Sequence, residues 1–354
     1  MKRYNNLYSQ ITSYENLQLA HKNAQKGKRH YPEVVKVNAR EEEYLTDLQR
    51  QLQDKTFVNS EYATFIKEGL KKDRTIYKLP YYPDRIVHHA IMNVCEGFWQ
   101  QSLIRDTYAS LKGRGIHDGV ERMKGFLQDR ENTLYCLKFD IKKFYPSIDN
   151  NILFYEILPK KIKCKDTLWL LGQIIYSTVG LPIGNYLSQI GGNLFLNPFD
   201  WFIKQTKRIK YYARYCDDLV VLHSSKQFLH ELKQECEEWL WDNLRLQVKG
   251  NWQVFPRLQR PIDFLGYVFC DGYTLVRKDI KERFIRKINN IRKRWRSLPA
   301  SKIVNTIMSY YGWFKYANAK NLWNKHIDGE IKSIMAKVCK ENNITNPLRR
   351  LNYA

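Results

Sequence analysis

The chain has 354 residues, more than one compact domain usually contains, so we expect two or three subdomains. Its 59 Lys and Arg residues outnumber its 36 Asp and Glu residues, and the resulting formal charge of +23 predicts a polyanionic partner, first of all nucleic acid. No apolar stretch approaches the length of a spanning helix and the basic residues are spread along the chain, which disfavours a membrane partner.

The cysteines indicate the compartment. There are seven, widely spaced and without a Cys-x-x-Cys pair, which is typical of reduced intracellular thiols and not of a zinc site or a disulfide framework. The first ten residues are polar, with two early cations and no apolar core typical of a secretory signal. We therefore expect a cytoplasmic protein.

Residues 1 to about 60 are predicted to be helical and charged, with apolar side chains at helical spacing between Tyr44 and Leu52. From Tyr62 the pattern changes to two polar-rich strands separated by a polar turn. Three cations of the second strand and its approach are candidates for phosphate contact or, alternatively, ordinary surface charges: Lys72, Arg74 and Lys78.

A glycine-rich loop, Gly113–Gly119, carries Arg114 and precedes a predicted helix from Val120 to Phe126. Glycines let a backbone approach a phosphate closely, and the N-terminus of a helix favours an anion. The loop is therefore a candidate for contact with a nucleic-acid backbone, although a lone Gly-x-Gly is weak evidence and also fits an ordinary turn.

Two stretches place acids at strand ends. Leu137–Asp140 is an apolar strand that ends in an acid, and Arg214–Leu222 is predicted to be strand, tight turn and strand with Asp217 and Asp218 at the tip. Adjacent carboxylates repel each other, so a cation such as Mg²⁺ is expected to keep them ionised, although Asp is also common in solvated turns. One acid on a strand followed by two on a hairpin is how nucleotidyl transferases hold two metal ions.

The C-terminal part is predicted to contain three helices. In the first, apolar residues from Ile280 to Trp295 recur at helical spacing while cations cover the other faces. The other two are expected over Ile303–Phe314 and Leu322–Val338. A merely solvated basic helix is less expected because few acids balance the charge, and the cations predicted to contact nucleic acid are Arg283, Arg286, Lys287, Arg292 and Lys293.

With its Tyr-x-Asp-Asp hairpin and the acid-bearing strand before it, the chain resembles reverse transcriptases. Between these stretches, Gly180–Gln189 reads Gly-Leu-Pro-Ile-Gly-Asn-Tyr-Leu-Ser-Gln. This Ile-Gly-x-x-x-Ser-Gln pattern resembles the reverse transcriptases of diversity-generating retroelements, where group II intron and retroviral enzymes have Gln-Gly. Three further stretches agree with that family: Asn6–Leu17, Tyr108–His117 and Trp252–Tyr267.

The resemblance implies an α+β right-hand polymerase with fingers, a palm built on an antiparallel sheet and a helical thumb. We expect an N-terminal helical extension over residues 1–60, interleaved fingers and palm over 61–275, and a three-helix thumb over 276–354. After the hairpin we expect a helix over Phe228–Leu240 and a strand over Leu244–Val248. Phe264–Phe269 resembles the primer-grip hairpin.

The resemblance also implies roles for single residues. Asp140, Asp217 and Asp218 would be catalytic and would hold two Mg²⁺ ions, with the backbone carbonyl of Ile141 as a further ligand and Mn²⁺ as the alternative ion. Tyr145 would clash with a 2′-hydroxyl and so select deoxynucleotides; the alternative is a core tyrosine. The residues expected at the nucleotide are Arg74, Lys78, Tyr145, Ile183, Gly184, Ser188 and Gln189. Those expected at nucleic acid are Arg114 and the five thumb cations.

The function implied is synthesis of error-prone, adenine-mutagenised cDNA from a template-repeat RNA. The alternatives are a reverse transcriptase of another bacterial element, such as a retron, defence system or intron, and a catalytically inactive RNA-binding polymerase fold. The expected partners are template RNA, the RNA/DNA duplex, deoxynucleotides and a small, oligomeric accessory protein, with no membrane.

Overall fold

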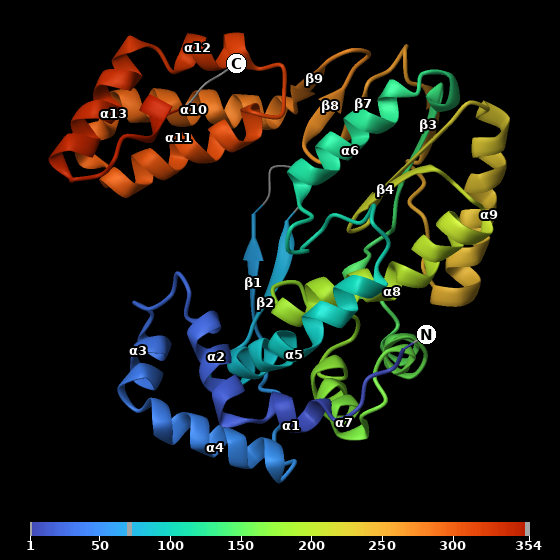
Figure 1. Cartoon of the computed structure of the whole chain (residues 1–354), viewed down its shortest axis with the longest axis vertical. Helices are drawn as coiled ribbons and strands as arrows, with labels where there is room; N and C mark the ends of the chain where they lie inside the picture. Colours follow the sequence, from blue (N-terminus) through green and yellow to red (C-terminus); the bar gives the residue numbers. More distant parts are fainter. Residues whose placement is uncertain (1, 69–72, 351–354) are drawn as a thin grey trace. The chain divides into compact units, whose positions relative to one another are not determined.

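The structure is a computed structural model that describes residues 2–68 and 73–350, and the chain divides into two units (Figure 1). The first consists of Met1–Lys112, Phe139–Leu219 and Glu231–Trp252, and the second of Gly113–Lys138, Val220–His230 and Gln253–Ala354. This division runs through two strands, β3 (Tyr135–Asp140) and β5 (Asp218–His223). The predicted boundaries of extension, fingers with palm, and thumb stay a prediction.

Helices dominate the first unit, and the N-terminal residues are helical as predicted. The apolar side chains of α4 that the sequence pattern predicted to share a face, Leu45, Leu48 and Leu52, are fully buried. At α2 the Ser13 side chain accepts a hydrogen bond from the Asn16 backbone N–H at 3.2 Å, which satisfies an otherwise unpaired donor of the first turn. The helices are α1 (Leu7–Ile11), α2 (Tyr14–Ala24), α3 (Pro32–Ala39), α4 (Glu41–Gln53), α5 (Ile86–Ser102), α7 (Lys165–Ile175), α8 (Tyr186–Trp201) and α9 (Lys226–Leu244), whose first turn belongs to the second unit.

The strands form antiparallel pairs. β1 and β2 make a two-stranded sheet in which Thr64 lies opposite Tyr77. A four-stranded sheet has the order β4-β5-β3-β6, with Leu137 of β3 opposite Val254 of β6, and a three-stranded sheet has the order β7-β8-β9. The remaining bounds are β1 (Ala63–Lys67), β2 (Arg74–Lys78), β4 (Tyr211–Tyr215), β6 (Gln253–Pro256), β7 (Ile262–Phe264), β8 (Tyr267–Phe269) and β9 (Thr274–Val276). Helices together with antiparallel sheets confirm the predicted α+β class.

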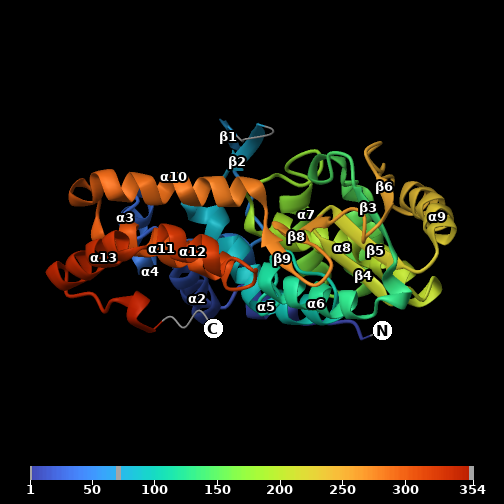
Figure 2. The same cartoon turned by 90° about the horizontal axis from the view of Figure 1, so that it is seen from above.

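In the second unit, α10 (Lys278–Arg294) packs against α11 (Ala300–Phe314) and α13 (Gly329–Glu341), as both views show (Figures 1 and 2). Four residues of the predicted apolar stripe of α10 are buried: Ile280, Phe284, Ile288 and Ile291. The predicted helix over Leu322–Val338 is instead two helices, α12 (Lys320–His326) and α13. The break has a local cause, because the Asp328 carboxylate caps α13 by accepting the Ile331 N–H at 3.1 Å. The unit also contains α6 (Ile116–Gln128).

Short 3₁₀ and π segments complete the described chain, and one expectation differs from what is observed. Only Val248 of the predicted strand Leu244–Val248 makes a bridge, to Ile141. The last residues of the Gly180–Gln189 segment belong to α8, which begins at Tyr186 and also contains Gly191 and Gly192. The short segments are Tyr81–Arg85, Glu131–Thr133, Tyr145–Ser147, Ile152–Ile157, Leu158–Lys160, Phe202–Thr206, Trp295–Ser297 and Pro347–Arg350.

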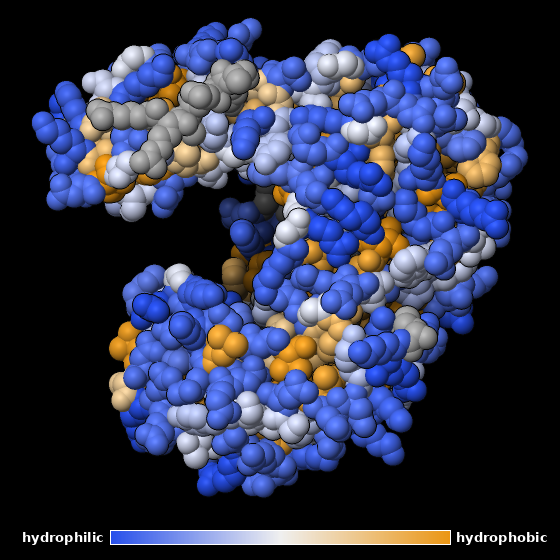
Figure 3. Space-filling model, in the orientation of Figure 1, coloured by the Kyte–Doolittle hydropathy of each residue, from blue (hydrophilic) through white to orange (hydrophobic). Residues whose placement is uncertain are grey.

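The surface agrees with the charge of the sequence. Hydrophilic residues cover most of the face shown in Figure 3, and apolar residues form separate patches on it. Across residues 2–68 and 73–350, every helix is too short or too polar to cross a membrane.

Candidate active site

The predicted strand–turn–strand at the paired acids is confirmed. β4 ends at Tyr215, β5 begins at Asp218, and Cys216 and Asp217 form the turn between these neighbouring strands. Cys216 has a φ of 53°, in the left-handed region that non-glycine residues seldom occupy. A positive φ of this kind is typical of the tight turns that join two antiparallel strands.

Asp140, at the end of β3, lies beside that turn. The Ile141 N–H donates to the Asp217 carbonyl oxygen at 3.1 Å, and the Lys249 N–H donates to the Asp140 carbonyl oxygen at 2.8 Å. The Ile141 side chain is fully buried. Backbone hydrogen bonds thus bring together Asp140 and Asp217, two of the predicted catalytic acids, entirely within the first unit.

Lys249 is a site residue that the sequence pattern did not reveal. Its Nζ lies 3.2 Å from Asp140 Oδ2 and 4.0 Å from Asp217 Oδ2. The only sequence signal is its place directly after Leu244–Val248, the segment that the bridge to Ile141 brings beside β3. Lys249 thus puts a positive charge between two of the acids.

The electrostatics of this site favour a cation. Burial raises the pKa of Asp217 and the neighbouring Asp140 carboxylate raises it further, whereas Lys249 and Arg74 lower it. Oxygen-rich carboxylate sites suit Mg²⁺, and the Lys249 ammonium acts as a stand-in cation between two of the acids. Within residues 2–68 and 73–350, no three His, Cys, Asp or Glu side chains are gathered closely enough to form a ready-made metal cage. The donor set fits a divalent ion, and its assignment to Asp140, Asp217, Asp218 and the Ile141 carbonyl stays a prediction.

Tyr145 lies at the same turn. Its hydroxyl is 3.8 Å from Cys216 Sγ, and burial raises the pKa of the phenol. The backbone carbonyl of Tyr145 accepts the Leu181 N–H at 2.9 Å. At Gly180, which has a φ of +69°, a Cβ would lie 2.7 Å from this carbonyl oxygen, so only glycine fits there. The close approach holds the tyrosine against the Gly180–Gln189 segment.

The strand β2 contacts that segment directly. The Tyr77 N–H donates to the Ile183 carbonyl oxygen at 2.8 Å. Gly184 has a φ of +122°, and a Cβ there would lie 2.5 Å from the Tyr77 carbonyl oxygen. β2 also begins with Arg74, whose charge lowers the pKa of Asp217. Arg74 is thus close enough to influence Asp217, and Ile183 is bonded to the same strand as Arg74; their contact with a nucleotide stays a prediction.

The surroundings of the other residues predicted to bind the nucleotide support that role less well. Lys78 Nζ lies 3.3 Å from the Glu33 carboxylate of α3, so the charge of Lys78 is engaged there. Ser188 is 4 % exposed and lines a small apolar cavity, whereas Gln189 on the next position of α8 is open to solvent. Lys72 lies outside the described residues. The nucleotide contacts of Lys78, Ser188 and Gln189 stay predictions.

The predicted nucleic-acid residues all belong to the second unit. Arg283 and Lys287 line a groove of about 560 Å³ between α10 and α11, together with Ile280 of the apolar stripe and with residues that the sequence did not single out: Lys302, Asn305, Thr306, Ser309, Tyr310 and Trp313. Arg286 and Lys293 are exposed on α10, and Arg114 lies in the loop before α6. Arg292 lies 3.1 Å from the Glu330 carboxylate and also pairs with Asp328, so it joins α10 to the start of α13. A phosphate contact by Arg292 would have to break these ion pairs.

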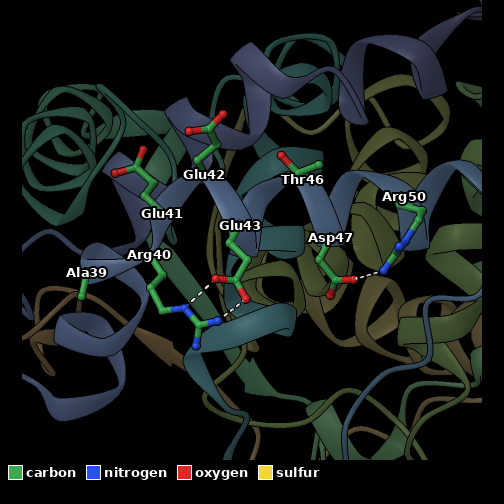
Figure 4. A pocket seen from close by; sticks show the side chains of 8 residues that line it. All are labelled: Ala39, Arg40, Glu41, Glu42, Glu43, Thr46, Asp47 and Arg50. Atoms are coloured by element: carbon green, nitrogen blue, oxygen red, sulfur yellow. Dashed lines mark hydrogen bonds and ion pairs between the residues drawn. The ribbon is translucent and has the colours of Figure 1, made fainter.

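A surface hollow along α3 and α4 does not suit a nucleotide (Figure 4). Arg40 forms an ion pair with Glu43, and Arg50 lies 2.6 Å from Asp47. Each cation in the hollow is already paired, and further acids stand beside them, so no positive charge remains to bind phosphate. Its lining residues are Ala39, Arg40, Glu41, Glu42, Glu43, Thr46, Asp47 and Arg50.

The chain is similar to known proteins in sequence and in structure. Among curated proteins, Protein YkfC of Escherichia coli (strain K12) is 22% identical over 299 residues, which cover 72% of this chain and 72% of that protein. Among solved structures, apo telomerase from Candida tropicalis aligns with a TM-score of 0.46 and 13% identity over 81% of this chain and 58% of that one. Telomerase from Candida albicans, in complex with a fragment of telomeric RNA, aligns with a TM-score of 0.46 and 10% identity over 84% and 67%. This chain thus spans little more than half of the Candida tropicalis chain.

The family model gives the decisive match. It describes reverse transcriptase (RNA-dependent DNA polymerase) and matches residues 66–269, more than half of the chain. The matched segment contains Asp140, the Gly180–Gln189 segment and the Asp217-Asp218 turn. The chain belongs to the reverse transcriptase (RNA-dependent DNA polymerase) family.

Proposed function

We propose that this reverse transcriptase makes adenine-mutagenised cDNA from the template-repeat RNA of a diversity-generating retroelement. The observation that carries the retroelement assignment is Ile183, which stands where, by the resemblance, group II intron and retroviral reverse transcriptases have Gln. Its carbonyl oxygen accepts a hydrogen bond from Tyr77 of β2, the strand that begins with Arg74, and both Ile183 and Arg74 would contact an incoming nucleotide.

The carboxylates supply the chemistry of nucleotidyl transfer. Reverse transcriptase domains use divalent metal ions, typically Mg²⁺, which activate the primer 3′-oxygen and neutralise the triphosphate. Asp140, Asp217, Asp218 and the Ile141 carbonyl would hold two such ions, and the Lys249 ammonium would leave its place between Asp140 and Asp217 when they bind. Arg74 would neutralise phosphate charge from the finger side, where a guanidinium binds phosphate in a bidentate manner.

Tyr145 would select the sugar. Its hydroxyl lies near Cys216 at the catalytic turn and its backbone is held against Gly180, so the ring has a fixed position beside the acids. A ring in that position would clash with a 2′-hydroxyl. Deoxynucleotides would therefore be preferred.

The thumb groove would hold the template–primer duplex. Arg283, Lys287 and Lys302 bring positive charge to its two walls, and neutral hydrogen-bonding groups lie between them. Cations bind phosphates at any sequence, while hydroxyl and amide groups can bond the 2′-hydroxyls of an RNA strand. The accessory protein expected from the family would act as a separate RNA-binding partner.

Substitution of Ile183 by Gln tests the retroelement assignment. Ile183 can offer shape alone, and discrimination by apolar shape is worth only about 1–3 kcal/mol, whereas a hydrogen-bonding site rejects mispairs more strongly. Ile183→Gln should lower misincorporation opposite template adenine while preserving extension, as measured by sequencing cDNA from one defined RNA. Ile183→Val is the matched control and should keep the parental error spectrum. Equal adenine errors in parent and Gln variant, both active, would favour a reverse transcriptase of another bacterial element. A parent that binds RNA but never extends a primer would favour the inactive RNA-binding fold.

A further inference from the structure

A buried ion pair lies next to the catalytic turn, which consists of Cys216 and Asp217. Arg214 of β4 and Asp200 of α8 are both 0% exposed. Arg214 Nε donates to Asp200 Oδ1 at 2.8 Å, and a terminal nitrogen donates to Oδ2 at 2.6 Å. This bidentate geometry fixes the plane of the guanidinium.

The rest of the pair is bonded as well. Asp200 accepts the Tyr212 hydroxyl at 2.6 Å and the Thr107 hydroxyl at 3.2 Å, and Arg214 donates to Asn193 Oδ1 at 3.1 Å. Removing two charges from water is costly, and an apolar pair of similar volume is often as stable. A fully bonded ion pair at this position therefore suggests a role beyond stability.

Arg214 also reaches the catalytic turn. The nitrogen that donates to Asn193 donates to the Cys216 carbonyl oxygen at 3.1 Å. Cys216 has the left-handed φ of 53°, precedes Asp217 directly, and places its Sγ 3.8 Å from the Tyr145 hydroxyl. The Arg214 guanidinium thus links Asp200 of α8 to Cys216. Cys216 in turn precedes Asp217 and lies beside Tyr145.

We propose that Arg214, held by Asp200, is a positioning residue that fixes the Cys216 turn and thereby sets both divalent-cation binding at Asp217 and sugar selection at Tyr145. The proposal rests on the proposed roles of Asp217 and Tyr145. A Lys at position 214 could keep the charge beside Asp200, but it lacks the planar fork that bonds Asp200 and Cys216 together.

The decisive variant replaces the pair by apolar residues, Arg214→Met with Asp200→Leu, which leaves no buried charge unpaired. Arg214→Lys is the second variant and retains the charge. Loss of one hydrogen bond from a charged group should weaken Mn²⁺ binding by about tenfold or more. Binding is measured by electron paramagnetic resonance of free Mn²⁺, without nucleic acid or catalysis. The preference for deoxynucleotides over ribonucleotides in primer extension should fall in the same variants.

Arg257→Lys is the matched control. Arg257 is another buried arginine, its Nε donates to the Thr133 carbonyl at 2.6 Å, and it belongs to the second unit. It should leave Mn²⁺ binding and sugar preference unchanged. Folded Arg214 variants with parental Mn²⁺ binding and sugar preference would overturn the proposal. Failure of both variants to fold would also overturn it, because the arginine would then serve the fold alone. A parent that binds Mn²⁺ in an Arg214-dependent way but extends no primer would instead contradict the proposed function.

Discussion

Replacing Lys249 by Met should tighten divalent-cation binding at the predicted catalytic acids Asp140 and Asp217. The Lys249 ammonium lies 3.2 Å from Asp140 Oδ2 and 4.0 Å from Asp217 Oδ2, so an incoming metal ion must displace it from the carboxylates. Met has a similar length and keeps the apolar packing of the side-chain stem, but it removes the competing charge. The variant therefore separates the positive charge from the shape of the residue.

The expected gain in metal affinity follows from the solvent exposure of the three side chains. The side chains of Lys249, Asp140 and Asp217 are 37%, 28% and 38% exposed, so solvent screens their attraction. An ion pair of this kind contributes about 0.2–1 kcal/mol. Relieving the competition should therefore strengthen Mg²⁺ binding about 1.4- to 5-fold. Lys249 also lowers the pKa of Asp217, so its loss should move the acid limb of metal binding to higher pH.

Isothermal titration of Mg²⁺ into the protein without nucleic acid, at several pH values, measures both effects. Lys142→Met is the matched control, because Lys142 Nζ lies 3.3 Å from Gln247 Oε1 and its substitution removes the same charge without removing a carboxylate contact. Well above the acid limb, Lys249→Met should bind Mg²⁺ more tightly than Lys142→Met. Unchanged or weaker binding in the Lys249 variant, or an equal gain in the control, would refute the competition between ammonium and metal.

Three further predictions concern catalysis, sugar choice and duplex binding. Asp218→Asn should abolish primer extension while RNA binding in a filter assay stays near parental, because the carboxylate acts on charge in the transition state; substantial extension would contradict its role. Tyr145→Ala should incorporate ribonucleotides far better than the parent, whereas Tyr145→Phe keeps the ring and should not; parental discrimination by the Ala variant would place the gate elsewhere. Neutralising Arg283, Arg286 and Lys287 together should lower the log–log salt slope of template–primer binding by roughly 0.7–0.9 per phosphate contact made, and an unchanged slope would leave α10 as a solvated face.

The sequence predicted those parts of the site whose conformation depends on residues that are neighbours in the chain. The hairpin at Asp217 follows from strand formers on both sides of two turn-forming acids, and the structure has that hairpin. The break between α12 and α13 was missed, because the apolar recurrence continues across it while Asp328 acts as a cap. Periodicity likewise could not place Ser188, since its burial depends on which face of α8 packs inward.

The residues that hold the acids could not be predicted, because their partners are distant in sequence. Lys249 meets Asp140 only because the Ile141–Val248 bridge brings the two segments together, and Arg214 reaches Asp200 through the packing of β4 on α8. The same reasoning corrects what total charge suggests about nucleic-acid binding. Arg214, Arg257 and Arg292 count toward the formal charge of +23, yet each is engaged by acids of its own chain. Only cations that stay open to phosphate release counterions on binding, and Arg283 of the α10–α11 groove lies 3.0 Å from the Asp279 carboxylate, so the measured salt slope should be smaller than the net charge of the chain suggests.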